Sequence, residues 1–224
     1  MKAKVAALIL AAGKSTRMLA PKLLLPFDDT TVIQQTVHNV LGSEVDEVLV
    51  VLGFQGDRLA RLLQHTPVRL VTNYNYKGGM LTSIVAGMNA VSPGMEASMI
   101  MPGDHPLIRS ATINSVLTAY RGSGKGIAVP VYEGRRGHPA IFSLTYRDEL
   151  LKLTHEGAQQ LLHGHPSDVL EVPVDTGEVL IDIDTFGDYY RARAVIHSGA
   201  QHGHNFPAAT TQRLSRTGRF SPDT

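Results

Sequence analysis

A short glycine-containing turn near the amino terminus has the residue types of a phosphate-binding loop. Six apolar residues, 5–10, are followed by Ala-Ala-Gly at 11–13. Small residues let a backbone approach a ligand closely, and the free N–H groups of such a turn can point at phosphate oxygens. Arg17 can then make forked contacts with a triphosphate, while Lys22 offers a compact charge for an α-phosphate that gains negative charge during transfer. An ordinary basic surface loop is an equally good interpretation of these residues alone.

Two other phosphate loops do not fit this turn. Gly13, Lys14, Ser15 and Thr16 imitate the end of a P-loop, which also requires a glycine five positions before Gly13. That position is Leu8, inside the apolar run. No GxGxxG pattern follows the run, which argues against a dinucleotide-binding Rossmann loop.

Three aspartates could hold a cation beside this turn. Asp104 follows the apolar residues 99–101 and a Pro-Gly turn, which predicts a carboxylate at the carboxyl end of a strand. Mg²⁺ takes one or two protein carboxylates together with phosphate oxygens, so a second aspartate would suffice. Asp182 and Asp184 alternate and would share one face of a strand. The alternatives are a helix cap for these two and a turn-stabilising role for Asp104.

Strands and helices must alternate to position these groups. Apolar runs bounded by turn residues are typical of strands in a sheet covered on both faces, and they occur at 5–10, 48–52, 68–71 and 98–101. Segments of helical periodicity lie between them, and Thr30 or Thr31 can cap the first. We therefore predict a three-layer, doubly wound α/β fold with a mainly parallel sheet and ligands at the strands' carboxyl ends.

The pattern changes after Val131. Residues 133–137 look like a turn between two short strands, an excursion expected to build a second binding surface. Further predicted elements are strands at 127–131, 140–143, 169–174 and 179–183, and helices at 147–153, 157–163 and 187–197. Residues 1–197 are predicted to form one domain. Residues 198–224 have almost no periodic apolar residues, which predicts a disordered tail.

Composition limits the partners. Lys and Arg total 21 against 20 Asp and Glu, so no overall field attracts nucleic acid or an anionic membrane. The absence of cysteine excludes disulfides, thiolate metal sites and a cysteine nucleophile, and favours a cytoplasmic location. The run at 5–10 is too short to span a bilayer, and a strand that leads into a phosphate loop explains it better than a secretion signal. The pairs His163/His165 and His202/His204 lack a clear third ligand for zinc.

Several motifs, in order, resemble those of the molybdenum-cofactor nucleotidyltransferases, over about residues 4–197. They are Leu10-Ala11-Ala12-Gly13 with Ser15, Arg17 and Met18; Pro21-Lys22 with Pro26; Asn73 with Gly78, Gly79 and Ser83; Gly103-Asp104-x-Pro106; Gly137-His138-Pro139; and Asp182-Ile183-Asp184-Thr185. The first resembles the cytidylyltransferase branch, since guanylyltransferases of the family have Leu-Ala-Gly-Gly there. A methyl group at Ala12 would narrow the base pocket toward a pyrimidine.

The resemblance implies a Mg²⁺-dependent enzyme that joins CMP from CTP, or another nucleoside monophosphate, to the phosphate of molybdopterin or the molybdenum cofactor. Nucleotide binding would fall to Leu10, Ala11, Ala12, Gly13, Ser15, Arg17, Lys22, Asn73, Gly79 and Ser83. Catalysis would fall to Arg17, Lys22 and Asp104. The metal would be held by Asp104 with Asp184 or Asp182, and the Asp-Thr pair favours Asp184. Arg136 and His138 would contact the acceptor, although a turn histidine without a ligand is also open.

Three residues depart from the family pattern: Leu19 replaces Gly, His105 replaces Met and Phe186 replaces Pro. A bulky Leu19 would reshape the triphosphate loop. Related sequences also occur as accessory proteins of molybdenum hydroxylases, which makes such a hydroxylase a candidate partner. Two alternatives therefore stay open: a nucleotidyltransferase acting on a sugar or alcohol phosphate, and a non-catalytic nucleotide- or cofactor-binding maturation factor.

Overall fold

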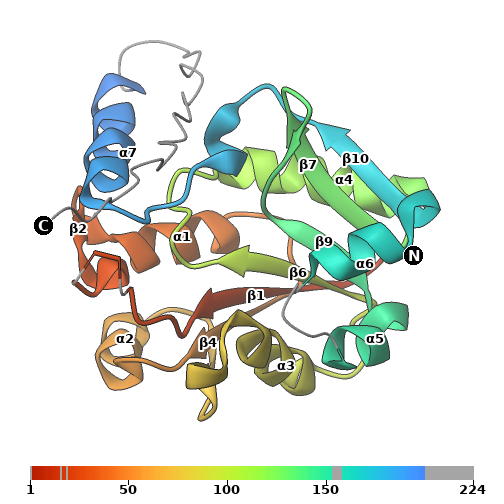
Figure 1. Cartoon of the computed structure of the whole chain (residues 1–224), viewed down its shortest axis with the longest axis horizontal. Coiled ribbons are helices and arrows are strands. Elements are labelled where there is room, and N and C mark those ends of the chain that lie inside the picture. Colours follow the sequence, from red (N-terminus) through yellow and green to blue (C-terminus); the bar gives the residue numbers. More distant parts are fainter. Residues whose placement is uncertain (1, 16, 19, 153–157, 200–224) are drawn as a thin grey trace, which may run out of the picture.

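One mixed sheet of eight strands organises the chain (Figure 1). The computed structural model describes residues 2–15, 17–18, 20–152 and 158–199. Residues 197–199 are described by backbone only. The strand order is β10 (Val169–Pro173), β7 (Ile127–Tyr132), β9 (Ala140–Ser143), β6 (Ala97–Pro102), β1 (Val5–Ala11), β4 (Glu47–Leu52) and β5 (Arg69–Thr72), with β8 (Arg135–Arg136) paired to β7. A separate two-stranded hairpin joins β2 (Pro26–Phe27) and β3 (Thr30–Thr31).

The predicted α/β fold is confirmed. Strands β6, β1, β4 and β5 run parallel, as do β10 and β7. Only β9 and the short β8 introduce antiparallel pairs into this sheet. The strands predicted from the apolar runs correspond to β1, β4, β5 and β6 within a residue or so at each end.

Helices cover both faces of the sheet. They are α1 (Val32–Leu41), α2 (Gly56–Leu63), α3 (Met80–Ala90), α4 (Ser110–Ser123), α5 (Arg147–Lys152), α6 (Gln159–Gly164) and α7 (Phe186–Gly199). The buried residues of α1, α2, α4 and α7 belong to one hydrophobic cluster, and those of α3, α5 and α6 to another. In Figure 1, α1 and α4 accordingly lie on one side of β1 and β6, and α3 and α5 on the other.

Strand β1 explains why its sequence is apolar at every position. Val5, Ala7 and Ile9 face the first cluster, whereas Ala6 and Leu8 face the second. All five side chains are fully buried. A strand buried on both sides cannot alternate with polar residues, so a continuous apolar run is the expected pattern.

The predicted excursion after β7 is part of the sheet. The chain turns at Glu133 and Gly134, and β9 then inserts antiparallel between β7 and β6. It therefore extends the sheet, although the turn between β8 and β9 does reach the candidate site described below. At the first helix, Thr31 is the cap, since its hydroxyl accepts a hydrogen bond from the Gln34 N–H.

The strand predicted at 179–183 is wrong. Residues Gly177–Leu180 form a short 3₁₀ turn, and an irregular segment leads from it to α7. The carbonyl of Val179 accepts from the His138 N–H (2.9 Å), and the Ile183 N–H donates to Asp104 (3.2 Å). Backbone groups that bond to two different loops cannot form a ladder with one strand.

The last helix is longer than predicted. Helix α7 ends at Gly199, two residues beyond the predicted end of the helix at residue 197, and the remainder of the predicted tail lies outside the described residues. In the part of the chain that is described, no helix is long and apolar enough to cross a membrane.

Candidate active site

The turn after β1 presents open backbone. A Cβ atom at Gly13 would have no neighbour within 4 Å. Behind the turn, a Cβ at Gly53 would collide with the Ala12 methyl group (2.7 Å) and with Tyr76 (2.6 Å). Glycine at position 53 therefore lets the loops after β1 and β4 touch. Accessible backbone of this kind is what a phosphate cradle requires.

The loop itself fixes Lys22. The Lys22 N–H donates to the Ser15 hydroxyl (3.3 Å), and the Met18 N–H donates to the Ser15 carbonyl (3.1 Å). Ser15 adopts a φ of 53°, a left-handed conformation that costs a non-glycine residue about 1–3 kcal/mol and is common at functional sites. Leu23, the next residue, anchors the loop in the core. The departure at Leu19 lies outside the described residues.

Asp104 lies where β6 ends, beside the end of β1. The Gly103 N–H donates to the Leu10 carbonyl (2.9 Å), and a Cβ at Gly103 would lie 3.0 Å from that oxygen. From α1, the Thr36 hydroxyl donates to the Gly103 carbonyl (3.0 Å). Glycine at 103 thus brings the turn after β6 directly against β1, and Asp104 follows it.

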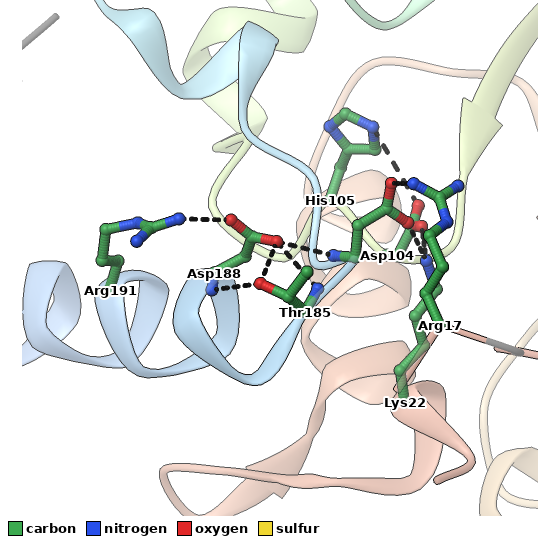
Figure 2. Close-up of polar contacts among 8 residues, drawn as sticks. Arg17, Lys22, Asp104, His105, Thr185, Asp188 and Arg191 are labelled. Carbon is green, nitrogen blue, oxygen red and sulfur yellow. Dashed lines mark hydrogen bonds and ion pairs between the residues drawn. The ribbon is translucent and has the colours of Figure 1, made fainter. Parts of the chain in front are cut away.

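Asp182 and Asp184 reach the same place from the segment before α7. The cap of α7 is made by other residues: the Thr185 hydroxyl accepts from the Asp188 N–H (3.2 Å), and the Asp188 carboxylate accepts from the Thr185 N–H (2.7 Å). This reciprocal pair is a capping box. The alternative in which Asp182 or Asp184 provides the cap is therefore wrong. Figure 2 shows Asp188 turned toward Thr185 and Arg191, away from the cluster around Lys22.

These loops enclose a cavity of about 440 Å³, a size typical of small-molecule sites. It brings together most of the residues predicted from the sequence. Those that line it are Leu10, Ala12, Gly13, Ser15, Arg17, Lys22, Gly79, Ser83, Asp104, His138, Asp182 and Asp184.

Opposite charges meet inside this cavity. Lys22 Nζ lies 2.5 Å from Asp104 and 2.9 Å from Asp184, and Arg17 contacts Asp184 as well (Figure 2). Burial opposes the charge of Lys22, but the two carboxylates outweigh it and raise the pKa of Lys22. Burial likewise opposes ionisation of Asp184, but Lys22 and Arg17 outweigh it and lower its pKa. The pKa of Asp182 is raised by burial and then by the charges of Asp184 and Asp104.

Two histidines form the wall beside Asp104. The rings of His105 and His138 meet edge to face, with centroids 5.0 Å apart. Burial is the main cause that lowers the pKa of both, that of His138 to about 3. Nδ1 of each ring is buried without a hydrogen-bond partner. The wall therefore offers uncharged groups that donate or accept according to their tautomer.

The carboxylates fit a divalent ion whose coordination is completed by phosphate oxygens. Within the described ranges, no three His, Asp or Glu side chains form a ready-made metal cage. Mg²⁺ needs only one or two protein carboxylates when substrate and water supply the remaining ligands. Asp104 and Asp184 already share one cationic group, Lys22, and burial, then the negative charges of Asp184 and Asp104, raise the pKa of Asp182. These three aspartates are the residues that would hold the ion.

Ala11 and Asn73 support the cavity without lining it. Ala11 is fully buried in β1. Asn73 is 4% exposed, and its amide nitrogen donates to the hydroxyls of Thr82 (2.9 Å) and Ser83 (3.0 Å) while its oxygen accepts from the Asn75 N–H (2.9 Å). Asn73 thus braces the turn before α3, and Ser83 and Gly79 face the cavity.

Arg136 does not reach the cavity. It lies on the short strand β8, opposite Val131 of β7, and is exposed. Its Nε donates to Glu171 on the outer strand β10 (2.8 Å). The predicted contact with an acceptor is therefore not supported for Arg136, whereas His138, two residues later in the turn, does line the cavity.

Some lining residues were not predicted from the sequence. Lys14, Tyr76 and Lys77 belong to the wall, and Lys14 Nζ lies 6.0 Å from the centre of the Tyr76 ring. The available signal is their position beside glycine turns, since Lys14 follows Gly13 and Lys77 precedes Gly78. Neither neighbour alone distinguishes a lining residue from an exposed one.

The fold is nucleotidyltransferase-like, and the candidate site lies at the carboxyl ends of its parallel strands. Residues 7–169 match the MobA-like NTP transferase domain. The chain belongs to the MobA-like NTP transferase family.

Individual relatives point to more than one activity. The molybdenum cofactor cytidylyltransferase of Escherichia coli (strain K12) is 28% identical over 189 residues, which cover 83% of this chain and 94% of the relative. The nicotine blue oxidoreductase of Paenarthrobacter nicotinovorans is also 28% identical, over 200 residues that cover 84% of this chain and 95% of the relative. Overall identity therefore does not choose between them.

Solved structures share this fold. Rv0371c from Mycobacterium tuberculosis H37Rv superposes with a TM-score of 0.78 at 29% identity, covering 87% of this chain and 99% of that one. A structure of Rv0371c in complex with manganese superposes with a TM-score of 0.73 at 27% identity, covering 87% and 100%.

Proposed function

We propose that this protein transfers CMP from CTP to the phosphate group of molybdopterin or of the molybdenum cofactor and releases pyrophosphate. The observation that carries the proposal is the convergence of the turn at Gly13, the cations Arg17 and Lys22, and the carboxylates of Asp104 and Asp184 on one cavity. An anion cradle opposite paired carboxylates suits a triphosphate bound with a divalent ion.

In the proposed reaction, an oxygen of the acceptor phosphate attacks the α-phosphorus of CTP in line. The bond from that phosphorus to the bridging oxygen breaks, the bridging oxygen keeps the electron pair, and pyrophosphate leaves. Transfer of this kind requires positioning and charge neutralisation, with no nucleophilic side chain. Lys22 neutralises charge at the α-phosphate, and Arg17 holds the remainder of the triphosphate. Mg²⁺ at Asp104 and Asp184 would supply further neutralisation.

Ala12 supports CTP as the nucleotide. Both it and Tyr76 line the cavity, and its methyl group would be the part of the turn that meets a larger base. Exclusion of a larger purine by such a wall discriminates by about 1–3 kcal/mol. The similarity to the Escherichia coli cytidylyltransferase supports both the nucleotide and the acceptor. The neutral wall of His105 and His138 would hydrogen-bond the uncharged part of the acceptor.

The carboxylates in the cavity support divalent-ion chemistry. Three aspartates line it, and burial and like charge raise the pKa of one, Asp182. Such crowding of carboxylates suits a divalent cation that accompanies the triphosphate. The manganese complex of Rv0371c supports a divalent ion in this family.

The test is pyrophosphate release with Mg²⁺ and each of CTP, GTP, ATP and UTP, with and without molybdopterin, with the product identified by mass spectrometry. We expect release only with CTP and molybdopterin together, and a product heavier than the acceptor by one CMP. Release with a sugar or alcohol phosphate in place of molybdopterin would instead make the acceptor assignment wrong. Binding of CTP and molybdopterin without any release would support the maturation factor.

A further inference from the structure

Glu178 is a buried acid close to the site but outside the cavity. It is 2% exposed and belongs to the 3₁₀ turn Gly177–Leu180. Its carboxylate accepts hydrogen bonds from the backbone N–H and from Nε of Arg109, each at 3.1 Å, and from the hydroxyl of Thr112. A buried carboxylate is tolerated only when it is paired in this way.

The partners of Glu178 mark the start of α4. Arg109 precedes the helix, and its own side chain makes no capping hydrogen bond. The carboxylate of Glu178 accepts from the N–H of this N-cap residue, as the acid of a capping box does, at the helix end where the dipole favours negative charge. This contact joins residues that are far apart in the sequence.

Glu178 thereby connects the two segments that carry the aspartates. Arg109 ends the turn that begins at Asp104, and Glu178 begins the segment that ends with Asp182 and Asp184. A second link lies nearer the cavity, where the Ile183 N–H donates to the Asp104 carbonyl (3.2 Å). The segment after Glu178 has no strand partner, so these links, together with the bond from the His138 N–H to the Val179 carbonyl, hold it in place.

We propose that Glu178 is a positioning residue of the metal site, which sets the placement of Asp182 and Asp184 relative to Asp104. The inference rests on the proposed function in one respect, namely that these aspartates hold the divalent ion. Groups that hold metal ligands in place typically affect metal affinity about 10–100-fold when they are changed.

The decisive variant is Glu178→Gln. Glutamine keeps the shape but replaces one acceptor oxygen with an NH₂ group, which then opposes a donor of Arg109 or Thr112. We expect the Kd for Mn²⁺, measured by electron paramagnetic resonance with CTP present, to rise about tenfold. CTP affinity without metal should stay unchanged, and KM for Mg²⁺ should rise while kcat at saturating Mg²⁺ stays near wild type. Arg109→Ala removes only a partner whose side chain is 70% exposed and should have a smaller effect.

Asp168→Asn is the matched control. The Asp168 carboxylate also ties two loops together, by accepting from the Gly126 N–H (2.9 Å) and from the Tyr146 hydroxyl, but it does not line the cavity. The Asp168→Asn variant should have a lower melting temperature than wild type and the wild-type affinity for Mn²⁺. An unchanged Kd in Glu178→Gln, or an equal rise in Asp168→Asn, would overturn the positioning role.

Asp104→Asn separates this inference from the proposed function. If that variant binds Mn²⁺ as wild type does, the metal site and with it the proposed function fail. If Asp104→Asn loses Mn²⁺ and Glu178→Gln does not change the affinity, only the positioning role fails. Circular dichroism and melting curves test whether each variant is folded. If Glu178→Gln does not fold, Thr112→Val replaces it. Thr112→Val removes one donor to Glu178 and should also weaken Mn²⁺ binding.

Discussion

The ammonium group of Lys22 lies 2.5 Å from the carboxylate of Asp104, and 2.9 Å from that of Asp184. The same carboxylates would hold the metal ion, so Lys22 and the ion compete for them. Nucleotide phosphates would draw Lys22 away and free the carboxylates. Nucleotide and metal should therefore bind cooperatively, and by linkage each should raise the affinity for the other by the same factor.

Removing this ammonium should strengthen metal binding in the nucleotide-free protein. We expect Lys22→Gln to lower the Kd for Mn²⁺ about fivefold or more, the usual range for coupled sites, while turnover falls. Paramagnetic titration of Mn²⁺ without nucleotide measures the affinity. Lys14→Gln is the control, since Lys14 lines the same cavity and lies near Tyr76. Equal or weaker Mn²⁺ binding in Lys22→Gln would contradict the competition.

Asp182 should give the stability a defined pH dependence. Burial, then Asp184 and Asp104, raise its pKa above the ordinary 3.8, so the unfolded chain ionises this carboxyl more readily. Above the folded pKa the group therefore lowers the free energy of unfolding, and below 3.8 this effect is absent. Asp182→Asn should melt at a higher temperature than wild type at neutral pH without metal.

The advantage of Asp182→Asn should shrink as the pH falls toward 3.8. Melting curves in chelator over this range test it, with Asp175→Asn, an exposed acid of the preceding segment, as the control. A lower melting temperature for Asp182→Asn at neutral pH would contradict the crowding of charge.

Local sequence pattern predicted the parallel half of the sheet because burial on both faces requires continuous apolar runs. Val5 to Leu10 illustrate this, since neighbouring residues of β1 face opposite clusters. The insertion of β9 between β6 and β7 could not be predicted, because strand order depends on contacts between distant segments. The apolar residues at 179–183 were mistaken for a strand because their burial comes from loop packing against His138 and Asp104.

The motif residues of the site were predicted better than their partners. Gly13, Lys22 and Asp104 meet because the carboxyl ends of neighbouring parallel strands share one edge of the sheet. Arg136 was misplaced because sequence alone does not tell which way a residue in a two-residue strand points. Glu178 gave no signal at all, since its partner Arg109 is distant in the chain and belongs to no motif.

Gly137 should tolerate no side chain. A Cβ there would collide with the carbonyl of Val179, which also accepts the His138 N–H. We expect Gly137→Ala to lower the free energy of unfolding by about 1–3 kcal/mol, as overpacking does. Gly122→Ala in α4 is the control, because a Cβ there meets nothing within 4 Å. It should raise the free energy of unfolding by about 0.4–1 kcal/mol. Urea denaturation measures both, and equal stabilities would contradict the close contact.

His138 and Arg136 should differ in their effect on the acceptor. His138 lines the cavity, whereas Arg136 is paired with Glu171 at the sheet edge. His138→Ala should therefore raise KM for molybdopterin by about tenfold, the loss of one hydrogen bond to a buried group. Arg136→Ala should leave it within about twofold, since exposed pairs contribute little. Steady-state kinetics at saturating CTP measure both KM values. A larger KM in Arg136→Ala than in His138→Ala would show that the acceptor binds at β8.

The most direct measurement is acceptor-dependent pyrophosphate release from CTP by wild type, Asp104→Asn and Asp46→Asn. Asp46 is a matched aspartate at the other end of β1, where its carboxylate accepts from the Val5 N–H (2.8 Å). We expect Asp46→Asn to retain the wild-type turnover. Turnover should fall about 100-fold or more in Asp104→Asn, as when a charge-stabilising group is removed. Turnover at the wild-type rate in Asp104→Asn would contradict a metal-dependent transfer site in this cavity.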